Sequence, residues 1–274
     1  MTSLRIAETS SSAPPRGVEL WRGPSRIDGS PIVLLATLRS SNRKTGDMVQ
    51  TWILRADVDP LEALASGADA SVCGECPHRG DRRRGGTRGR TCYVNVGQAP
   101  AGVWDAWRRG RYPRLDVRRW SDAFAGRAIR LGAYGDPGAV PLRVLRRLAA
   151  AGDRWTGYSH QWRRFPGLRG LCMASVDSEA ERAEAERRGW RTFRVRLPGE
   201  APAAGEVECP AALQDDSGEP LSSCDRCGLC AGSLDGRRGS AGRPIPSISI
   251  EAHGGAATMN AVRSIARTRG TLAG

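Results

Sequence analysis

Short apolar blocks alternate with polar stretches along most of this chain. The first two blocks, "PIVLLATL" at 31–38 and "MVQTWILR" at 48–55, flank a segment that contains the turn-forming residues Asn42, Gly46 and Asp47. Two apolar runs of strand length that are joined by such a segment predict a β-hairpin. We therefore expect an antiparallel pair of strands in the N-terminal part of the chain.

The hydrophobic pattern changes near residue 127, where apolar runs of strand length are separated by amphipathic runs of helix length. The expected strands are 127–134, 154–158, 171–176 and 190–197. Strands that alternate with helices indicate parallel βαβ units. The sequence therefore predicts an α/β fold in which these units form a partial sheet, either a half-barrel or a doubly wound sheet. The N-terminal β-hairpin and Cys-rich loops would be attached to this sheet.

The folded part of the chain is expected to be a single domain. Residues 1–16 are rich in Ser and Pro, which is typical of a disordered arm. Residues 17–254 are expected to form one α/β metal-binding domain that includes a C-terminal cysteine cluster at 205–235. Residues 255–274 are expected to form a tail or a short helix.

Polar and aromatic residues gather where the expected strands end. Reactive side chains of parallel α/β sheets collect at the carboxyl ends of the strands. This rule nominates three groups: Tyr134, Gly135 and Asp136; Tyr158, Ser159, His160 and Gln161; and Ser175, Asp177 and Ser178. Helix capping is the simpler explanation for Asp136, which precedes Pro137, and for Ser178, which has capping-box spacing to Glu181. A structural role is also the simpler explanation for a single histidine such as His160.

Seven of the eight cysteines fall into two groups. The first is CxxC followed, after fifteen residues, by a third cysteine: Cys73, Cys76 and Cys92. The second is one cysteine, fourteen residues, and then CxxCxxC: Cys209, Cys224, Cys227 and Cys230. Two residues between cysteines let both sulfurs reach one metal at about 2.3 Å, whereas persistent disulfides are rare in cytoplasmic proteins. We therefore expect both groups to bind metal.

The cysteine patterns leave the identity of the metal open. Four thiolates satisfy a tetrahedral Zn²⁺ and equally a 4Fe–4S cluster. In the first group, His78 could supply a fourth ligand and close a Cys₃His zinc site. If His78 does not bind, three thiolates leave one iron of a 4Fe–4S cluster open, which is the arrangement that catalysis needs. Cys172 lies inside the apolar segment "LCMASV" and is expected to be a buried thiol.

A strong positive charge makes nucleic acid a candidate partner. The formal net charge is +13, but Lys44 is the single lysine among 42 basic residues, so GC-biased coding also explains the excess of Arg. A glycine-rich basic loop between Cys76 and Cys92 could contact phosphate. Its arginines are Arg79, Arg82, Arg83, Arg84, Arg88 and Arg90. The alternative is a solvated, flexible loop.

The composition is that of a soluble globular protein. Apolar residues make up 39% of the chain and the mean hydropathy is −0.43. The polar start shows no signal-peptide pattern, and no apolar run approaches the ~20 residues that a membrane helix needs. The sequence therefore predicts a cytoplasmic protein without a membrane partner.

Segments spread over residues 31–254 carry a family resemblance. They are "NRKTGDMVQTWIL", "CGECPHR", "CYVNVGQAP", "IRLGAYGDPGAVP", "WTGYSHQW", "CMASVDS", "GWRTFRVR", "CDRCGLCAG" and "SISIEAHG". These segments resemble an uncharacterised family encoded by phages and plasmids, related to the mycobacteriophage gene product 88 type. The resemblance implies a protein of mobile-element origin and supplies no established activity.

The chain is also distantly similar to radical S-adenosylmethionine enzymes, which have a partial β/α barrel and three cluster cysteines near its first strand. On this resemblance, the first cysteine group would hold a 4Fe–4S cluster, with Tyr93 in the aromatic position beside its last ligand. Gly135 and Asp136 at the second strand, and Ser175 at a later one, would contact S-adenosylmethionine. The second cysteine group would correspond to an auxiliary cluster. The chain departs from the family in its CxxC plus a distant cysteine, and in having Asp136 where Glu is expected.

Two functional hypotheses follow from these patterns. The leading one is a metal-dependent α/β enzyme of unknown substrate with an open iron–sulfur site at the first cysteine group, in which Tyr158, His160 and Asp177 contact the substrate or cofactor. The competing one is a zinc-stabilised nucleic-acid-binding protein in which both cysteine groups are structural and tryptophans stack on bases. A host-interaction protein without chemistry is a third option. The segment "SISIEAHGG" is further expected to return a strand to the sheet edge and to bring His253 near the metal.

Overall fold

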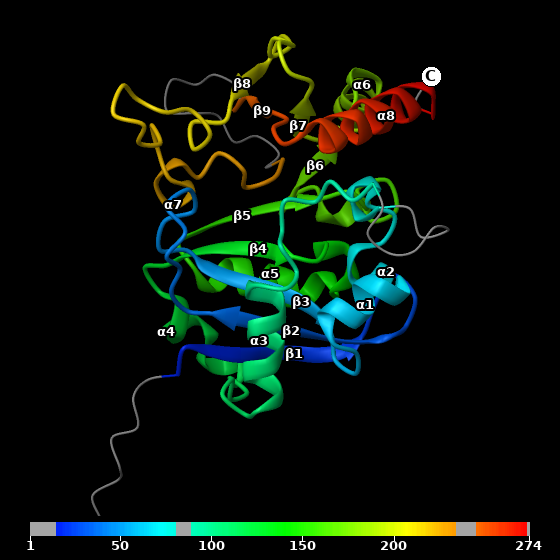
Figure 1. Ribbon diagram of the computed structural model, residues 1–274. Helices are drawn as coiled ribbons and strands as arrows, with labels where there is room; N and C mark the ends of the chain where they lie inside the picture. The colour runs from blue at the N-terminus through cyan, green and yellow to red at the C-terminus, as the bar shows by residue number, and fades with distance from the viewer. Residues whose placement is uncertain (1–14, 81–88, 234–244, 273–274) are drawn as a thin grey trace, which may run out of the picture.

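One sheet of nine strands organises the parts of the chain that the computed structural model describes, residues 15–80, 89–233 and 245–272. In spatial order the strands are β1 (Gly17–Pro24), β2 (Pro31–Thr37), β3 (Val49–Arg55), β4 (Ala128–Tyr134), β5 (Arg154–Ser159), β6 (Met173–Val176), β7 (Thr192–Arg196), β9 (Ser247–Glu251) and β8 (Glu206–Glu208). Figure 1 shows them stacked in this order from bottom to top. The first three strands pair antiparallel, and every pair from β3 onward is parallel. The predicted α/β class and the hairpin of β2 and β3 are confirmed.

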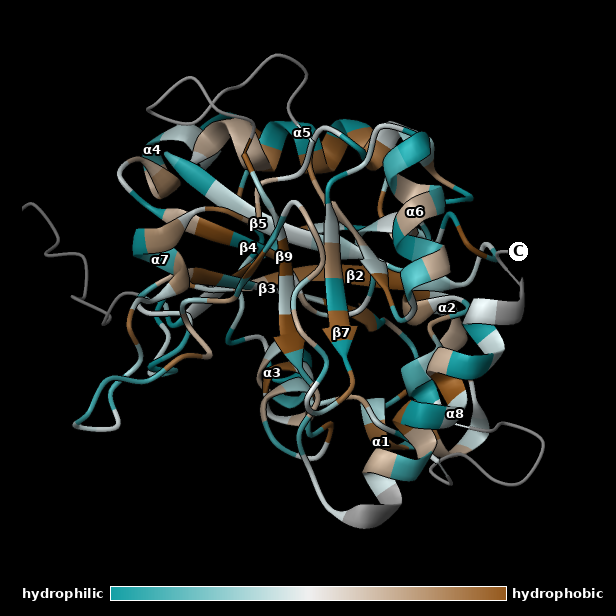
Figure 2. Ribbon diagram, turned by 90° about the horizontal axis from the view of Figure 1, so that it is seen from above, coloured by the Kyte–Doolittle hydropathy of each residue, from teal (hydrophilic) through white to brown (hydrophobic). Residues whose placement is uncertain are grey.

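The parallel strands follow one another in a single direction from β3 to β7. Right-handed crossovers that advance in one direction place their helices on the same face of a sheet. Figure 2 accordingly shows α4 (Trp120–Phe124), α5 (Leu142–Ala151) and α6 (Glu179–Arg187) along one side of the strands. This is the arrangement of a half-barrel, because a doubly wound sheet reverses its strand order midway.

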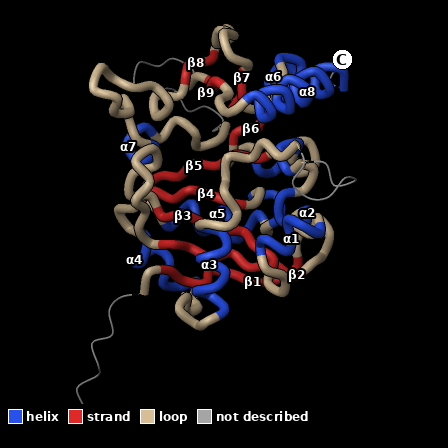
Figure 3. Tube along the Cα trace, in the orientation of Figure 1, coloured by secondary structure: helices blue, strands red, loops and turns tan. Residues whose placement is uncertain are grey.

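The remaining helices lie between the parallel units or after them. They are α1 (Pro60–Ser66), α2 (Ala70–Cys73), α3 (Ala99–Arg108), α7 (Cys224–Cys227) and α8 (Ala256–Leu272), with single 3₁₀ turns η1 (Pro77–Arg79), η3 (Val117–Arg119), η4 (Pro137–Ala139) and η5 (Pro166–Leu168). The chain is mostly loop between α2 and α3 and again between β8 and β9 (Figure 3). These two stretches carry most of the cysteines of both groups.

The C-terminal residues form a helix of 17 residues, α8, where a tail or short helix was expected. Met259 and Val262 of α8 are buried against Ala252, which follows β9. Near the other end of the helix, a guanidinium nitrogen of Arg269 lies 3.6 Å from a carboxylate oxygen of Glu181 in α6. No helix within the described ranges has both the length and the apolarity that crossing a membrane requires.

The alternation of side chains along the parallel strands separates the core from a cavity. Successive side chains of a strand point to opposite faces of the sheet. In β4, Ile129 and Leu131 are fully buried in the main apolar core, whereas Arg130 and Gly132 line a cavity on the other face. The cavity therefore lies on the inner face of the parallel strands, opposite Ile129 and Leu131, while the core also includes Leu64 of α1 and Trp107 of α3, which pack on β3.

Three features of the fold differ from the pattern in the sequence or lie outside it. β1 pairs with β2 although its segment, "GVELWRGP", was not expected to be a strand. β9 does not lie at the sheet edge, because it inserts between β7 and β8 and is parallel to both. The arm expected at residues 1–16 lies almost wholly outside the described residues.

Candidate metal-binding cavity

A cavity of about 430 Å³ opens on the inner face of the sheet. Five parallel strands contribute to its wall: Arg130, Gly132 and Tyr134 from β4, Thr156 and Tyr158 from β5, Ser175 from β6, Phe193 and Val195 from β7, and Ile250 from β9. All three cysteines of the first group line this cavity, and so do Cys209 and Cys224 of the second. Thiols more than 100 residues apart in sequence are thus brought to one hollow.

The loop that carries the first cysteine group is anchored to the ends of β4 and β5. The backbone amide of Asp136 donates to the carbonyl oxygen of Val72 at 2.7 Å. The side-chain amide of Gln161 donates to the carbonyl oxygen of Cys73 at 3.4 Å. Gly74 follows with a φ of 59°, and a Cβ there would lie 2.4 Å from the Gln161 side chain. Glycine is therefore needed where this loop approaches β5.

Arg79 holds the same loop from inside. Its guanidinium is buried against the Asp69 carboxylate and also donates to the carbonyl oxygens of Gly74 and Gly67, at 2.8 and 3.0 Å. Arg79 therefore acts as a structural tie, and a buried pair of this kind leaves it no freedom to reach phosphate.

Arg90 is also engaged internally, through hydrogen bonds to the carbonyl oxygens of Cys92 and Val94 at 3.1 and 2.9 Å. The other predicted phosphate contacts, Arg82, Arg83, Arg84 and Arg88, lie outside the described residues. All eight tryptophans are described, and none is among the exposed large apolar side chains. Base stacking by tryptophan therefore finds no support, and phosphate binding by the four undescribed arginines stays a prediction.

The thiols of the first group differ in their electrostatic surroundings. Burial raises the pKa of Cys73 and of Cys92 above the usual range of a thiol. Burial also opposes ionisation of Cys76, but the charge and hydrogen bond of His160 and the charge of His78 together outweigh it, so the pKa of Cys76 is lowered. Cys76 is therefore the first of the three thiols to ionise, and a bound metal would have to displace protons from the other two.

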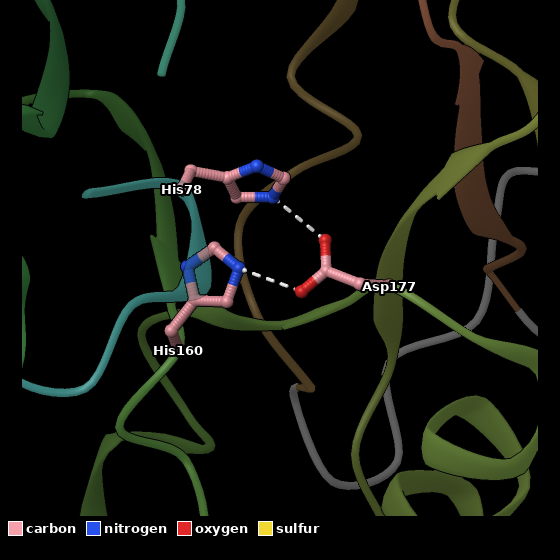
Figure 4. A group of neighbouring side chains, drawn as sticks. All are labelled: His78, His160 and Asp177. Carbon is pink, nitrogen blue, oxygen red and sulfur yellow. Dashed lines mark hydrogen bonds and ion pairs between the residues drawn. The ribbon is translucent and has the colours of Figure 1, made fainter. Parts of the chain in front are cut away.

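Beside Cys76, two histidines converge on one buried carboxylate (Figure 4). Nε2 of His78 lies 2.7 Å from Oδ1 of Asp177, and Nε2 of His160 lies 3.2 Å from Oδ2 of the same carboxylate. The second contact is close enough for an ion pair, but its geometry does not make a hydrogen bond, so these two buried atoms have no hydrogen-bond partner. Nδ1 of His78 lies 2.6 Å from the hydroxyl oxygen of Thr91.

The charges within this triad reinforce one another. Burial would raise the pKa of Asp177, but the two imidazoles lower it below its usual range. Burial would likewise lower the pKa of His160, but the Cys76 sulfur and the Asp177 carboxylate raise it well above that of a free imidazole. Neighbouring charges therefore dominate over burial at every member of the triad.

Local structure at the strand ends places each member of the triad. His78 belongs to the 3₁₀ turn η1, immediately after Cys76 and Pro77. The backbone amide of His160, just past β5, donates to Oδ2 of Asp136 at 2.8 Å. The backbone amide of Asp177, just past β6, donates to the carboxylate of Glu181 at 2.9 Å. The capping-box spacing of Ser178 and Glu181 therefore serves both to start α6 and to fix Asp177.

The residues predicted to bind S-adenosylmethionine all line the cavity, but they have different surroundings. Both carboxylate oxygens of Asp136 are used internally, by the Gly138 amide, the Ser159 hydroxyl and the His160 amide. A Cβ on Gly135 would lie 2.6 Å from the Cβ of Ile53.

Tyr93 and Ser175 complete this set. Tyr93 is exposed and stacks on His253, with ring centroids 4.9 Å apart. His253 was predicted to lie near the metal, and in the structure its ring contacts Tyr93. Ser175 is buried in the cavity wall. Cofactor contact by these four residues stays a prediction, and capping of η4 accounts for one of the bonds of Asp136, that from the Gly138 amide.

The four cysteines of the second group line a much smaller cavity together with Thr156 and Ile248, and it adjoins the large one through Thr156, Cys209 and Cys224. The amides of Ala211 and Ala212 hydrogen-bond the Cys209 sulfur. The Tyr158 hydroxyl hydrogen-bonds the Cys230 sulfur, so Tyr158 contacts this group as well as lining the large cavity. Amide and hydroxyl donors around sulfur are the surroundings that metal-bound thiolates require.

The second group is packed firmly onto the sheet. The backbone amide of Gly157 in β5 donates to the carbonyl oxygen of Cys230 at 3.0 Å, and the amide of Cys224 donates to that of Lys44 at 2.9 Å. Gly232 has a φ of 79°, and a Cβ there would lie 2.7 Å from the backbone of Leu171. Burial raises the pKa of Cys224 to about 11 and that of Cys230 to about 12.

None of the eight cysteines, all of which lie in the described residues, forms a disulfide. Cys172 is fully buried in the main core, as its apolar context predicts.

Comparison with known proteins finds no matching family model, no matching curated protein and no matching solved structure. The resemblances in the sequence therefore stay predictions, and function has to be argued from the cavity.

Sequence reasoning anticipated several residues of the site but not how they combine. His160, Asp177 and the first cysteine group were predicted at one site and do meet there. The contact of His78 with Asp177 was missed, because 99 residues separate them and no local motif joins them. Tyr158 was predicted from its place at the carboxyl end of its strand, and it lines the same cavity as His160.

Proposed function

We propose that this protein is a metal-dependent enzyme whose cavity contains an iron–sulfur cluster at Cys73, Cys76 and Cys92, with a second cluster at the four C-terminal cysteines. The observation that carries the proposal is that both cysteine groups reach the same 430 Å³ cavity on the inner face of the sheet. Structural zinc sites stabilise a fold wherever they lie, so two such sites do not have to line the same cavity. A shared hollow gives the metals a common access to a small molecule.

The described cysteine sulfurs do not show the close spacing of an occupied zinc site. A tetrahedral zinc with bonds of about 2.3 Å draws its sulfurs to about 3.8 Å from one another. Within the described residues, one ligand atom each of His78, His160 and Asp177 lie within 4.8 Å of one another. No three cysteine sulfurs in this part of the chain lie that close together.

The partners of His78 support an open position in the first cluster. Nδ1 contacts Thr91 and Nε2 contacts Asp177, so both ring nitrogens are engaged away from the cysteines. Without His78, the first group supplies three thiolates, which leave one iron of a 4Fe–4S cluster free for a ligand. Such a cluster supplies single electrons to the bound molecule. S-adenosylmethionine is the ligand that the family resemblance implies.

The proposal is tested by comparing two cysteine variants after anaerobic purification. Cys92→Ala should lose the absorption near ~400 nm that belongs to the first cluster and keep that of the second. Cys172→Ala removes a buried thiol outside both groups and should keep the full spectrum of the wild type. Equal spectra for wild type and Cys92→Ala would refute cluster binding at the first group. Circular dichroism of both variants checks that the fold is retained.

A further inference from the structure

We propose that His78, His160 and Asp177 form a mononuclear site for a divalent first-row cation such as Fe²⁺ or Mn²⁺. This site shares no ligand with either cysteine group, because all of its ligands are nitrogen and oxygen atoms, although Cys76 lies beside His160. It goes beyond the proposed iron–sulfur function and does not depend on it. The argument rests on geometry, on unpartnered atoms and on the support behind each ligand.

The geometry matches that of a known type of metal site. One ligand atom from each of the three side chains lies within 4.8 Å of the other two. Two imidazoles and one carboxylate make the facial triad that binds Fe²⁺ in non-haem iron proteins and leaves further coordination positions open. The ligands come from η1, from the end of β5 and from the end of β6, so they converge on one point from three directions (Figure 4).

Two atoms of the triad lack a hydrogen-bond partner. Nε2 of His160 and Oδ2 of Asp177 are both buried and face each other at 3.2 Å without forming a hydrogen bond. An unsatisfied buried polar atom costs about 1–3 kcal/mol, and the ion pair between these two atoms offsets that cost without supplying the missing hydrogen bond. A cation that accepts a lone pair from each atom would satisfy both. The Asp177 side chain is only 4% exposed, so bulk solvent does not readily supply the missing hydrogen bond.

Each ligand is held from behind by a second contact. The Thr91 hydroxyl lies 2.6 Å from Nδ1 of His78, which leaves Nε2 directed at Asp177. Asp136 accepts from the amide of His160, and Glu181 accepts from the amide of Asp177. The Thr91 contact fixes the orientation of the His78 ring, as outer contacts of metal ligands do, and the other two hydrogen bonds position the backbone of His160 and Asp177.

The site can be reached from the large cavity. His78 and His160 both line this cavity, and Cys76 lies beside His160. The open coordination positions of the cation would therefore face the hollow that the first cysteine group also lines. A small molecule with an oxygen ligand, such as a carboxylate, could bind the cation while the rest of it occupies the 430 Å³.

Mn²⁺ is a suitable probe, because it prefers nitrogen and oxygen ligands over thiolates and has its own electron paramagnetic resonance signal. Titration of the full chain with MnCl₂ should show one tightly bound Mn²⁺ per chain. Asp177→Asn and His160→Asn should lose this binding, and Thr91→Val should weaken it about 10- to 100-fold. His253→Ala removes the other histidine of the cavity wall and should bind as the wild type does. Cys92→Ala should also keep Mn²⁺, which separates this site from the proposed cluster.

Pulsed resonance on the wild type gives a second readout that does not depend on the folding of a variant. Bound Mn²⁺ should show magnetic coupling to the nitrogens of two imidazoles. Absence of stoichiometric binding, absence of nitrogen coupling, or equal binding by Asp177→Asn and His253→Ala would each overturn the proposal. In that case the triad is an ion-pair network in which the two histidines are protonated and no metal binds.

Discussion

At the scale of single residues, the cavity depends on buried charges that are matched at close range. Asp177 stands between two imidazoles, and Arg79 is enclosed by Asp69 and two carbonyl oxygens. Spacing in the sequence identified the cysteines, because CxxC is a local pattern. Sequence spacing did not identify the partners of His78 or Arg79, because the sequence around a single charged residue does not indicate which distant residue it will contact.

Arg79→Met should destabilise the protein strongly, because it leaves the Asp69 carboxylate buried without a partner. Breaking a buried ion pair on one side costs about 3–5 kcal/mol. Urea unfolding of the metal-free protein measures this loss. The same variant should also speed the reaction of Cys73 and Cys76 with a thiol reagent, since Arg79 ties down their loop. Arg118→Met, which breaks an exposed pair with Asp116, is the control and should change neither quantity. Equal stability of the two variants would contradict the role given to Arg79.

At the scale of elements, the strands of the parallel units were predictable because apolar runs and helix-length separators repeat. β1 was missed because Glu19 and Arg22 interrupt its apolar pattern, although Glu19 is buried in the fold. β8 has only three residues, which is too short to leave a pattern. The insertion of β9 between β7 and β8 depends on long-range pairing that no local segment specifies. The same holds for the four-cysteine loop that this insertion places against β5.

The buried thiols of that loop should make the metal-free protein less stable in alkali. The pKa of Cys230 is raised by burial from 9.0 to about 12, so between these values the unfolded chain ionises this thiol and the folded chain does not. Its contribution to the free energy of unfolding is therefore complete below about pH 9 and is lost as the pH rises, by on the order of 1 kcal/mol at pH 10. Urea unfolding at pH 7 and pH 10 should show a smaller alkaline loss for Cys230→Ala than for the wild type. An identical loss in both proteins would contradict this assignment.

At the scale of the whole molecule, the half-barrel explains why distant segments serve one site. Parallel strands bring their carboxyl ends to one edge, and the loops that follow them meet over the inner face. The sequence predicted this class of fold and the residues at the strand ends, because both follow from alternation and order. It did not predict that both cysteine groups would reach one cavity, because that depends on how far the sheet curves and on the place of β9.

The most direct test of the central claim is the analysis of iron, acid-labile sulfide and zinc in the anaerobically purified wild type. Two 4Fe–4S clusters would give about eight iron and about eight sulfide per chain with little zinc. A colourless protein with stoichiometric zinc and no sulfide would contradict the claim and would make both cysteine groups structural.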